Sequence, residues 1–343
     1  MKFGPVPLDQ AEGKLLGHNI AGPDGKRLFR KGKPLTLADL ATLRGLGRAS
    51  VYVAELEPGD VDEDTAARRI AQAVRGVGLR LPGASSGRAN LLANALGLLR
   101  VGAERLARLN ACEGVTLATL PAHTAVRARQ MVATVKIIPY ALPEHTLREA
   151  EAIASEGGPL IRVDELSPQS VSLIFSGSDS IREKLADDFQ PLCERIEALG
   201  ATIASTDYIP LEDEAGEATL AETLRQRCAM GARLIVLAGE TAIMDAQDIV
   251  PRAVARAGGR VESLGAPVDP GNLLMLAYLN DVPILGAPGC ARSRKTNIID
   301  WALPRLLAGD HLTRRDILAL GHGGLLEDAP ERPMPRSAVN RSA

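Results

Sequence analysis

The stretch that decides the fold of the second half of the chain is Val171-Ser172-Leu173-Ile174-Phe175-Ser176-Gly177-Ser178-Asp179. Its first five residues are almost all apolar, which is typical of a strand covered on both faces of a sheet. The Ser-Gly-Ser-Asp run that follows stops the strand and opens the next element. Apolar residues then recur at spacings of three and four over residues 181–199, which predicts one amphipathic helix that ends at Gly200.

The same alternation continues toward the C-terminus. A strand is expected at residues 201–204, and the helix after it carries Leu220, Leu224 and Cys228 on one face. Further strands are expected at residues 234–238 and 283–286. The pattern predicts a three-layer α/β/α domain with a mostly parallel sheet over residues 165–326. In such sheets ligands bind at the carboxyl ends of the strands.

Residues 1–150 predict a smaller mixed α+β domain. Asp24-Gly25 is a hairpin turn signal, and Thr36 is expected to be the N-cap of a helix, with Asp39 completing a capping box. Strands are expected at residues 51–54 and 132–138. At the other end, residues 327–343 are rich in Pro, Arg and Ser and predict a disordered tail.

Composition excludes several classes of function. A chain of 343 residues exceeds one typical core, so two domains are expected. The net charge of −2 and the 3% aromatic content give no reason to expect a nucleic-acid partner. No apolar run approaches the length of a membrane helix. The N-terminus has no signal-peptide run and the four cysteines form no C-x-x-C pair, so a cytoplasmic protein is expected.

Three strand-end loops share one character. They cover residues 176–179, 239–248 and 287–293, and each combines small residues with a following helix start. Helix starts attract anions through unpaired N–H groups and the macrodipole. A single loop of this kind is more often a plain tight turn. Their recurrence at one predicted sheet edge indicates a binding site.

Motifs in these loops carry a resemblance. Gly239, Thr241 and either Asp245 or Asp248 resemble a Gly-Gly-x-Ser/Thr-x-Gly-x-x-Asp loop. Residues 286–293 are similar to a Gly-Leu-Pro-Gly-Asn-Pro-x-Ser element, and residues 267–274 are similar to a loop with a central Pro-Gly. On these motifs, residues 168–310 resemble the molybdopterin-binding domain shared by molybdopterin adenylyltransferases and molybdenum insertases.

The first half resembles, more loosely, an N-terminal domain that precedes this module in some bacterial molybdopterin-binding proteins. Residues 57–60, 87–90 and 130–139 carry that likeness. The strand that contains Lys136 fits a plain core strand equally well.

The resemblance implies a ligand, molybdopterin or its adenylylated form, that lies across the strand ends. The residues that it assigns to ligand binding are Gly177, Ser178, Asp179, Gly239, Glu240, Thr241, Pro270, Gly271, Asn272, Pro288, Gly289, Cys290, Arg292, Ser293 and Lys295. Arg292, Arg294 and Lys295 would supply positive charge to the phosphate. Asp245 and Asp248 are the implied catalytic carboxylates, and Asp245 would hold a Mg²⁺ ion.

Plainer explanations exist for several of these residues. Asp248 could cap the helix that begins at residue 249, and Asp179 could be an N-cap or a neighbour of the ligand. Cys290 could be a small packed residue instead of a thiolate. The basic cluster at residues 292–295 could be a solvated helix start.

The sequence also departs from the family's pattern. Ala238 and Ile243 stand where the family has glycines, and Asp269 and Asn272 stand where insertases place lysines. Cys290, with Ala291 after it, replaces an Asn and a Pro. Insertases carry a further C-terminal β domain, and none is recognised here.

Two functions follow from the resemblance. The first is a carrier or chaperone that binds molybdopterin or a derivative during molybdenum-cofactor biosynthesis. The alternative is a transferase, a Mg²⁺-dependent molybdopterin molybdotransferase that inserts molybdate into adenylylated molybdopterin. Besides the pterin, the expected partners are a nucleotidyltransferase or a target molybdoenzyme, and a homo-oligomer is expected.

Overall fold

The computed structural model describes residues 1–211 and 214–326. The chain divides into a first unit of residues 1–164 and a second unit that begins at Glu165. The tail predicted at residues 327–343 lies outside the described residues. None of the described helices is long and apolar enough to cross a membrane.

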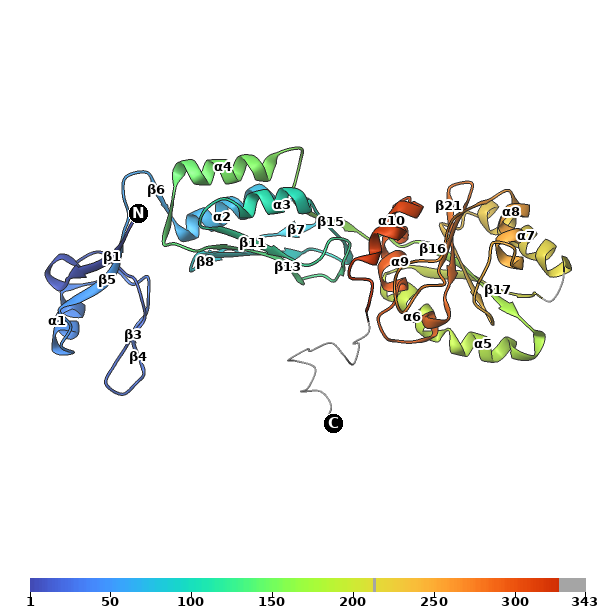
Figure 1. Cartoon of the computed structure of the whole chain (residues 1–343), viewed down its shortest axis with the longest axis horizontal. Helices are drawn as coiled ribbons and strands as arrows, with labels where there is room; N and C mark the ends of the chain where they lie inside the picture. The colour runs from blue at the N-terminus through green and yellow to red at the C-terminus, as the bar shows by residue number, and fades with distance from the viewer. Residues whose placement is uncertain (212–213, 327–343) are drawn as a thin grey trace. The chain divides into compact units, whose positions relative to one another are not determined.

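The first unit mixes short antiparallel strands with four α-helices (Figure 1). Its elements are β1 (Lys2–Pro7), β2 (Leu15–Leu16), β3 (Ile20–Ala21), β4 (Arg27–Phe29), α1 (Leu37–Gly45), β5 (Ser50–Glu55), β6 (Asp60–Asp62), α2 (Glu63–Val74), β7 (Leu79–Arg80), β8 (Ala84–Ser85), β9 (Arg88–Ala93), β10 (Gly97–Val101), α3 (Ala103–Asn110), β11 (Val115–Thr119), β12 (Ala125–Val126), β13 (Met131–Ile137), β14 (Ala141–Pro143), α4 (Glu144–Ser155) and β15 (Ile161–Glu165).

Local sequence signals in this unit form the predicted elements. Thr36 accepts a hydrogen bond from the Asp39 N–H (3.3 Å), and the Asp39 carboxylate accepts one from the Thr36 N–H (2.9 Å), so the capping box that begins α1 is confirmed. Strands β3 and β4 pair across the turn at Gly25, whose φ is 75°. The apolar face of α2 packs against β9 and β13 in a core that runs from Ala66 to Val163.

The second unit is built on one six-stranded mixed sheet. Its elements are β16 (Ser170–Gly177), η2 (Asp179–Ile181), α5 (Arg182–Asp188), α6 (Gln190–Ala198), β17 (Thr202–Pro210), α7 (Glu214–Ala229), β18 (Leu234–Gly239), α8 (Ile249–Ala257), β19 (Arg260–Leu264), β20 (Met275–Leu279), β21 (Val282–Ala287), η3 (Gly289–Arg292), α9 (Ile299–Leu307), α10 (Arg314–Leu318) and η4 (Ala319–Gly321).

The strand order is β17-β16-β18-β21-β20-β19. The first four strands are parallel to one another, whereas β20 runs antiparallel to both of its neighbours, β21 and β19. The sequence prediction missed the β20–β21 hairpin. Its turn is Asn280-Asp281, with φ of 48° and 65°, the conformation of a type I′ turn that Asn and Asp tolerate. The six-stranded sheet is therefore mixed, with β20 as its one reversed strand.

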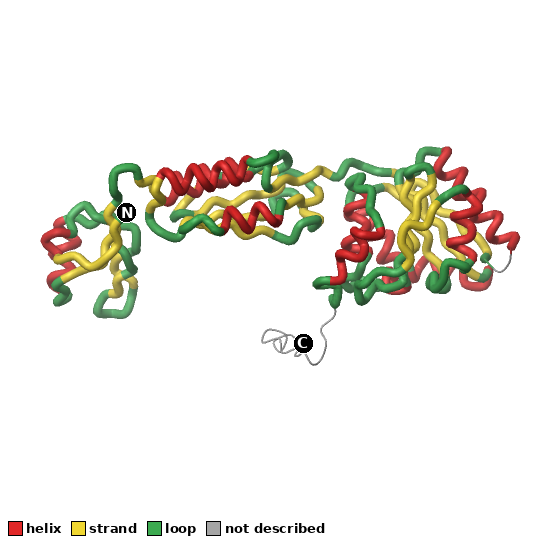
Figure 2. The backbone as a smooth tube through the Cα atoms, turned by 45° about the horizontal axis from the view of Figure 1, so that its top comes forward, coloured by secondary structure: helices red, strands yellow, loops and turns green. Residues whose placement is uncertain are grey.

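Helices lie on both sides of this sheet (Figure 2). On one face Ile174, Ile235 and Leu237 share a core with α7 and α8. On the other face Phe175 packs on Phe189, with ring centroids 6.1 Å apart. The alternation of these strand residues explains why β16 and β18 are apolar along their length.

The prediction of one helix over residues 181–199 is wrong. The chain instead forms η2, α5 and α6, with a break at Phe189. Pro191 explains the break, because proline has no N–H to donate to the preceding turn and its ring clashes with the carbonyl four residues earlier. The apolar face persists across the break, since Leu185, Phe189 and Ile196 are all buried.

Candidate functional site

A cavity of about 400 Å³ opens at the carboxyl ends of the parallel strands. Its polar lining comes from the loops after β16 and β18, and its apolar lining includes Leu211, Ile249 and Ala287. In chain order the four parallel strands are arranged 2-1-3-4, so β16 and β18 flank the point where the connections diverge to opposite sides. Crevices at such switch points are the usual ligand sites of open α/β sheets.

The loop after β16 contributes Gly177 and Ser178 to the cavity. The Ser178 N–H donates to the Glu240 carboxylate (2.9 Å), and a side chain at Gly177 would place its Cβ 2.8 Å from that of Glu240. Ser178, not Asp179, is the N-cap of η2. Asp179 is exposed and forms an ion pair with Arg182 (3.7 Å), so it lies outside the cavity lining.

The loop after β18 contributes Gly239, Glu240, Thr241 and Asp248. Asp248 is the N-cap residue of α8, but its carboxylate does not cap the helix. One of its oxygens, Oδ2, accepts the N–H groups of Met244 (2.6 Å) and Asp245 (3.0 Å) and so closes the loop on itself.

Asp245 has a different position from Asp248. Its carboxylate accepts the N–H of Gln247 (2.8 Å), and the residue is exposed and outside the cavity lining. Among the residues that the structure describes, the carboxylates that line the cavity are therefore those of Glu240 and Asp248. Within the described ranges, no group of three or more His, Cys, Asp or Glu side chains is placed to hold a metal ion.

Arg292 joins the loop after β21, which we call the third loop and which leads to α9, to the loop after β18, the second loop. Its Nη2 donates to the carbonyl oxygens of Gly239 (2.9 Å) and Glu240 (3.0 Å), and its guanidinium lies 4.8 Å from the ring centroid of Phe189. Its Nε is the one buried side-chain nitrogen or oxygen without a hydrogen-bond partner in the part of the chain that the structure describes. A buried donor without an acceptor is uncommon and calls for a partner.

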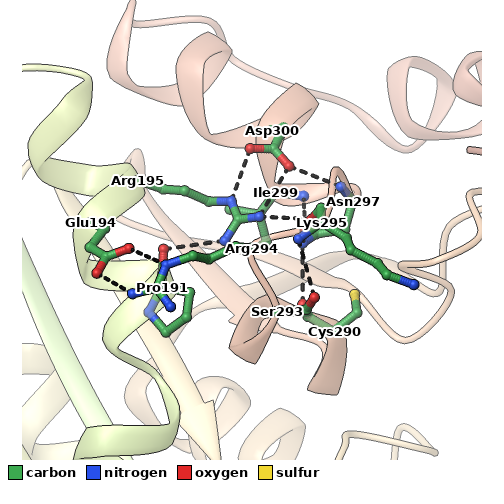
Figure 3. A network of polar contacts seen from close by, with 10 residues as sticks. All are labelled: Pro191, Glu194, Arg195, Cys290, Ser293, Arg294, Lys295, Asn297, Ile299 and Asp300. Carbon is green, nitrogen blue, oxygen red and sulfur yellow. Dashed lines mark hydrogen bonds and ion pairs between the residues drawn. The ribbon is translucent and has the colours of Figure 1, made fainter. Parts of the chain in front are cut away.

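The rest of the third loop is tied down by α6 and α9 (Figure 3). Arg195 donates to Asp300 (2.9 Å) and to the Lys295 carbonyl (2.9 Å). Asn297, which is fully buried, donates to the carbonyls of Cys290 (3.2 Å) and Lys295 (3.1 Å) and accepts the Ile299 N–H (3.0 Å). The sequence prediction missed this network, whose only signal was a polar residue just before an apolar helix.

The predicted basic cluster is partly neutralised. Arg294 forms a bidentate pair with Glu194 (2.6 and 3.0 Å), and these hydrogen bonds, with the charge of the guanidinium, hold the pKa of that carboxyl below the usual range. The Ser293 hydroxyl accepts the Lys295 N–H (3.1 Å). Of the described residues 287–295, only Ala287 belongs to the cavity lining. The predicted ligand-binding residues that lie outside it are Pro288, Gly289, Cys290, Arg292, Ser293 and Lys295.

Cys290 behaves as a packed thiol. Burial raises the pKa of its thiol, and this effect outweighs the nearby guanidinium of Arg195. The thiolate is therefore disfavoured at neutral pH.

The predicted Pro270-Gly271-Asn272 loop lies beside the start of α9. The Ile298 N–H donates to the Pro270 carbonyl (3.2 Å), and a Cβ at Gly271 would lie 2.5 Å from that of Ile298. The Asn272 carbonyl accepts the Ala266 N–H (2.9 Å). This loop contacts the third loop's helix but contributes nothing to the cavity lining.

Comparisons with known proteins give limited matches. The family model described as a domain of unknown function (DUF8806) matches residues 5–55. No curated protein matches the chain.

Three solved structures show loose similarity. A molybdenum cofactor biosynthesis protein from Pyrococcus furiosus has 13% identity and a TM-score of 0.24, with 93% of this chain and 65% of that chain covered. The molybdopterin biosynthesis moea protein from Pyrococcus horikosii has 13% identity and a TM-score of 0.28, with 89% and 75% covered. Formyltetrahydrofolate deformylase from Burkholderia mallei has 15% identity and a TM-score of 0.21, with 66% and 90% covered. The chain thus spans 65% of the length of the first structure. Superpositions this loose establish no shared function.

Proposed function

We propose that the second unit binds molybdopterin or a close derivative at the strand-end cavity and acts as its carrier or chaperone in molybdenum-cofactor biosynthesis. The observation that carries the proposal is the gathering of Gly177, Ser178, Gly239, Glu240 and Thr241 around one cavity at the switch point of the sheet. These residues come from two loops, with Ser178 and Glu240 62 positions apart in the sequence, and the second of these loops carries motifs of the resemblance to the molybdopterin-binding domain.

The cavity suits a ring system with a polar substituent. Its volume of about 400 Å³ lies in the range of small-molecule sites, which is roughly 300–1,000 Å³. Leu211, Leu237, Ile249 and Val250 give it an apolar side for a ring. Serine and threonine hydroxyls and loop N–H groups would hold the polar edge.

A phosphate bound in this cavity would lie near the carboxylates of Glu240 and Asp248. Glu240 already occupies the Ser178 N–H, where an anion would otherwise bind. A bound phosphate would displace that carboxylate or share a divalent cation with it. Arg292 lies outside the cavity lining, but its guanidinium donates to the Glu240 carbonyl (3.0 Å) and has an unpaired Nε, so it would supply positive charge beside this loop.

The test is to purify the protein from cells that make molybdopterin and to oxidise the released pterin to its fluorescent derivative. Thr241→Trp places an indole in the cavity, and Ala246→Trp is the matched control, because Ala246 is exposed on the same loop but outside the lining. We expect a stoichiometric pterin signal in the wild type and in Ala246→Trp, and its loss in Thr241→Trp. A wild type without pterin contradicts the proposal, and a signal kept in Thr241→Trp places the pterin elsewhere.

The alternative is a Mg²⁺-dependent molybdopterin molybdotransferase, and the observation that favours it is the pair of carboxylates in the cavity lining. Glu240 and Asp248 each use one oxygen for backbone N–H groups. Mg²⁺ commonly binds one or two carboxylates together with substrate phosphate oxygens, so these residues fit such an ion. It would stabilise the charge that develops as the phosphoanhydride is cleaved.

The transferase is tested by Mg²⁺-dependent release of AMP from adenylylated molybdopterin. We expect Asp248→Asn to abolish the release and Asp245→Asn, outside the cavity lining, to retain it. No release by the wild type leaves the carrier as the function. If Asp245→Asn loses AMP release and Asp248→Asn keeps it, the metal ligand is Asp245.

A further inference from the structure

A second cavity, of about 780 Å³, lies within the first unit and has an unusual concentration of rings. The chain has only four Phe, four Tyr and one Trp, yet Phe3 and Tyr140 line this one cavity together with His18 and His145. We propose that it binds a planar heteroaromatic molecule that carries an anionic group. This inference is independent of the function proposed for the second unit.

The rings form a contiguous cluster. Phe3 stacks near-parallel to Tyr140 (centroids 6.3 Å, 21°) and meets His18 edge-on (5.5 Å, 85°). Tyr52 contacts both Phe3 (6.0 Å) and His18 (5.4 Å). Phe3 is nonetheless 47% exposed and Tyr52 48% exposed. Exposed apolar surface gathered in one place marks binding sites more often than isolated exposed residues do.

The backbone is shaped to admit these rings. A Cβ at Gly17 would lie 2.9 Å from Cε2 of Phe3, and a Cβ at Gly32 would lie 3.4 Å from the Tyr140 ring. Gly32 also has φ of 79°, which other residues rarely adopt. The Tyr140 hydroxyl donates to the Gly17 carbonyl (2.8 Å) and holds the ring at the cavity. Glycine at both positions therefore lets the backbone approach the rings closely.

The polar lining suggests what the ring carries. Lys31 is the lysine of the lining, and its backbone N–H donates to Asn19 (2.8 Å), which places it beside His18. Met1 also lines the cavity, but its N-terminal ammonium already pairs with Glu57 (2.9 Å) and Asp60 (2.8 Å).

Two carboxylates, Glu63 and Glu113, also line the cavity. Lys136 pairs with Glu63 (3.2 Å) and compensates its charge, and Glu113 is exposed to solvent, which screens its charge. The lysine and the imidazoles can therefore receive an anionic group, while a ring stacks on Phe3 and Tyr140. Aromatic side chains stack on any planar base, so the ring class is broad.

The experiment is calorimetric titration of the full chain with three probes that share this chemistry: AMP, FMN and pterin-6-carboxylate. We expect at least one to bind, and Phe3→Ala to weaken its binding by about 5- to 100-fold. Met131→Ala, at an exposed apolar residue in the same unit outside the cavity, is the matched control and should bind as the wild type does. Thr241→Trp, which fills the other cavity, should leave the binding that depends on Phe3 unchanged.

Lys31→Ala separates the two halves of the ligand. It should reduce the advantage of AMP over adenosine by about 2- to 5-fold at low salt and leave adenosine binding unchanged. Because Lys31 is exposed, Lys31→Ala should fold normally. It therefore tests the anion site even if Phe3→Ala fails to fold. The proposal is overturned if no probe binds the wild type at millimolar concentration. It is equally overturned if Thr241→Trp loses binding while Phe3→Ala keeps it.

Discussion

Replacement of Asn297 by alanine should destabilise the second unit by about 2–4 kcal/mol. The fully buried Asn297 makes three side-chain hydrogen bonds. Their loss costs different amounts of free energy, because two of the three partners keep another hydrogen bond. The Cys290 carbonyl keeps the Ser293 N–H (2.9 Å), and the Lys295 carbonyl keeps Arg195 (2.9 Å). The Ile299 N–H is left without its acceptor, which costs about 1–3 kcal/mol, and the two weakened carbonyls add the remainder.

The assay is thermal unfolding followed by tryptophan fluorescence. The single tryptophan, Trp301, lies in α9, so the signal reports on this unit. A loss of that size corresponds to a melting temperature lower by roughly 5–15 °C. Gln247→Ala, on an exposed loop of the same unit, is the control and should change stability by less than about 0.5 kcal/mol. If Asn297→Ala melts within about 1 °C of the wild type, the network is not what holds the third loop.

Two further predictions concern stability. Hydrogen bonds from Lys33 and then from the Thr36 N–H hold the pKa of Asp39 below its ordinary value of 3.8. The stabilisation that Asp39 gives the first unit is therefore present above pH 3.8 and is lost as the pH falls through the lower pKa of the folded state. Acid unfolding of Asp39→Asn, followed by circular dichroism, should lack that part of the pH dependence, and a profile equal to that of the wild type would contradict the prediction. Gly271→Ala should destabilise the second unit by about 2 kcal/mol or more, because its φ is 143° and the new Cβ would lie 2.5 Å from that of Ile298. Gly289→Ala, with open space around its Cβ, should be neutral in the same melts, and equal effects of the two substitutions would refute the steric argument.

Patterns confined to a few neighbouring residues were predicted correctly from the sequence. The capping box of α1, the hairpin turn at Gly25 and strands such as β16 and β18 follow from contacts within one turn or from burial on both faces. The same local reasoning overextended the helix at residues 181–199, because apolar spacing continues through Pro191 although the backbone hydrogen bonds do not.

The sequence by itself therefore determined the alternation of strands and helices and placed the loops that follow β16, β18 and β21 at strand ends. Only the tertiary structure decided which of those loops share a cavity. Glu240 reaches Ser178, and Arg292 reaches the carbonyl of Glu240, across separations of 62 and 52 positions. Such pairings depend on strand order and on the length and direction of side chains. Spacing along the chain specifies neither, and this is why Asp248 lines the cavity while Asp245, three residues away, lies outside its lining.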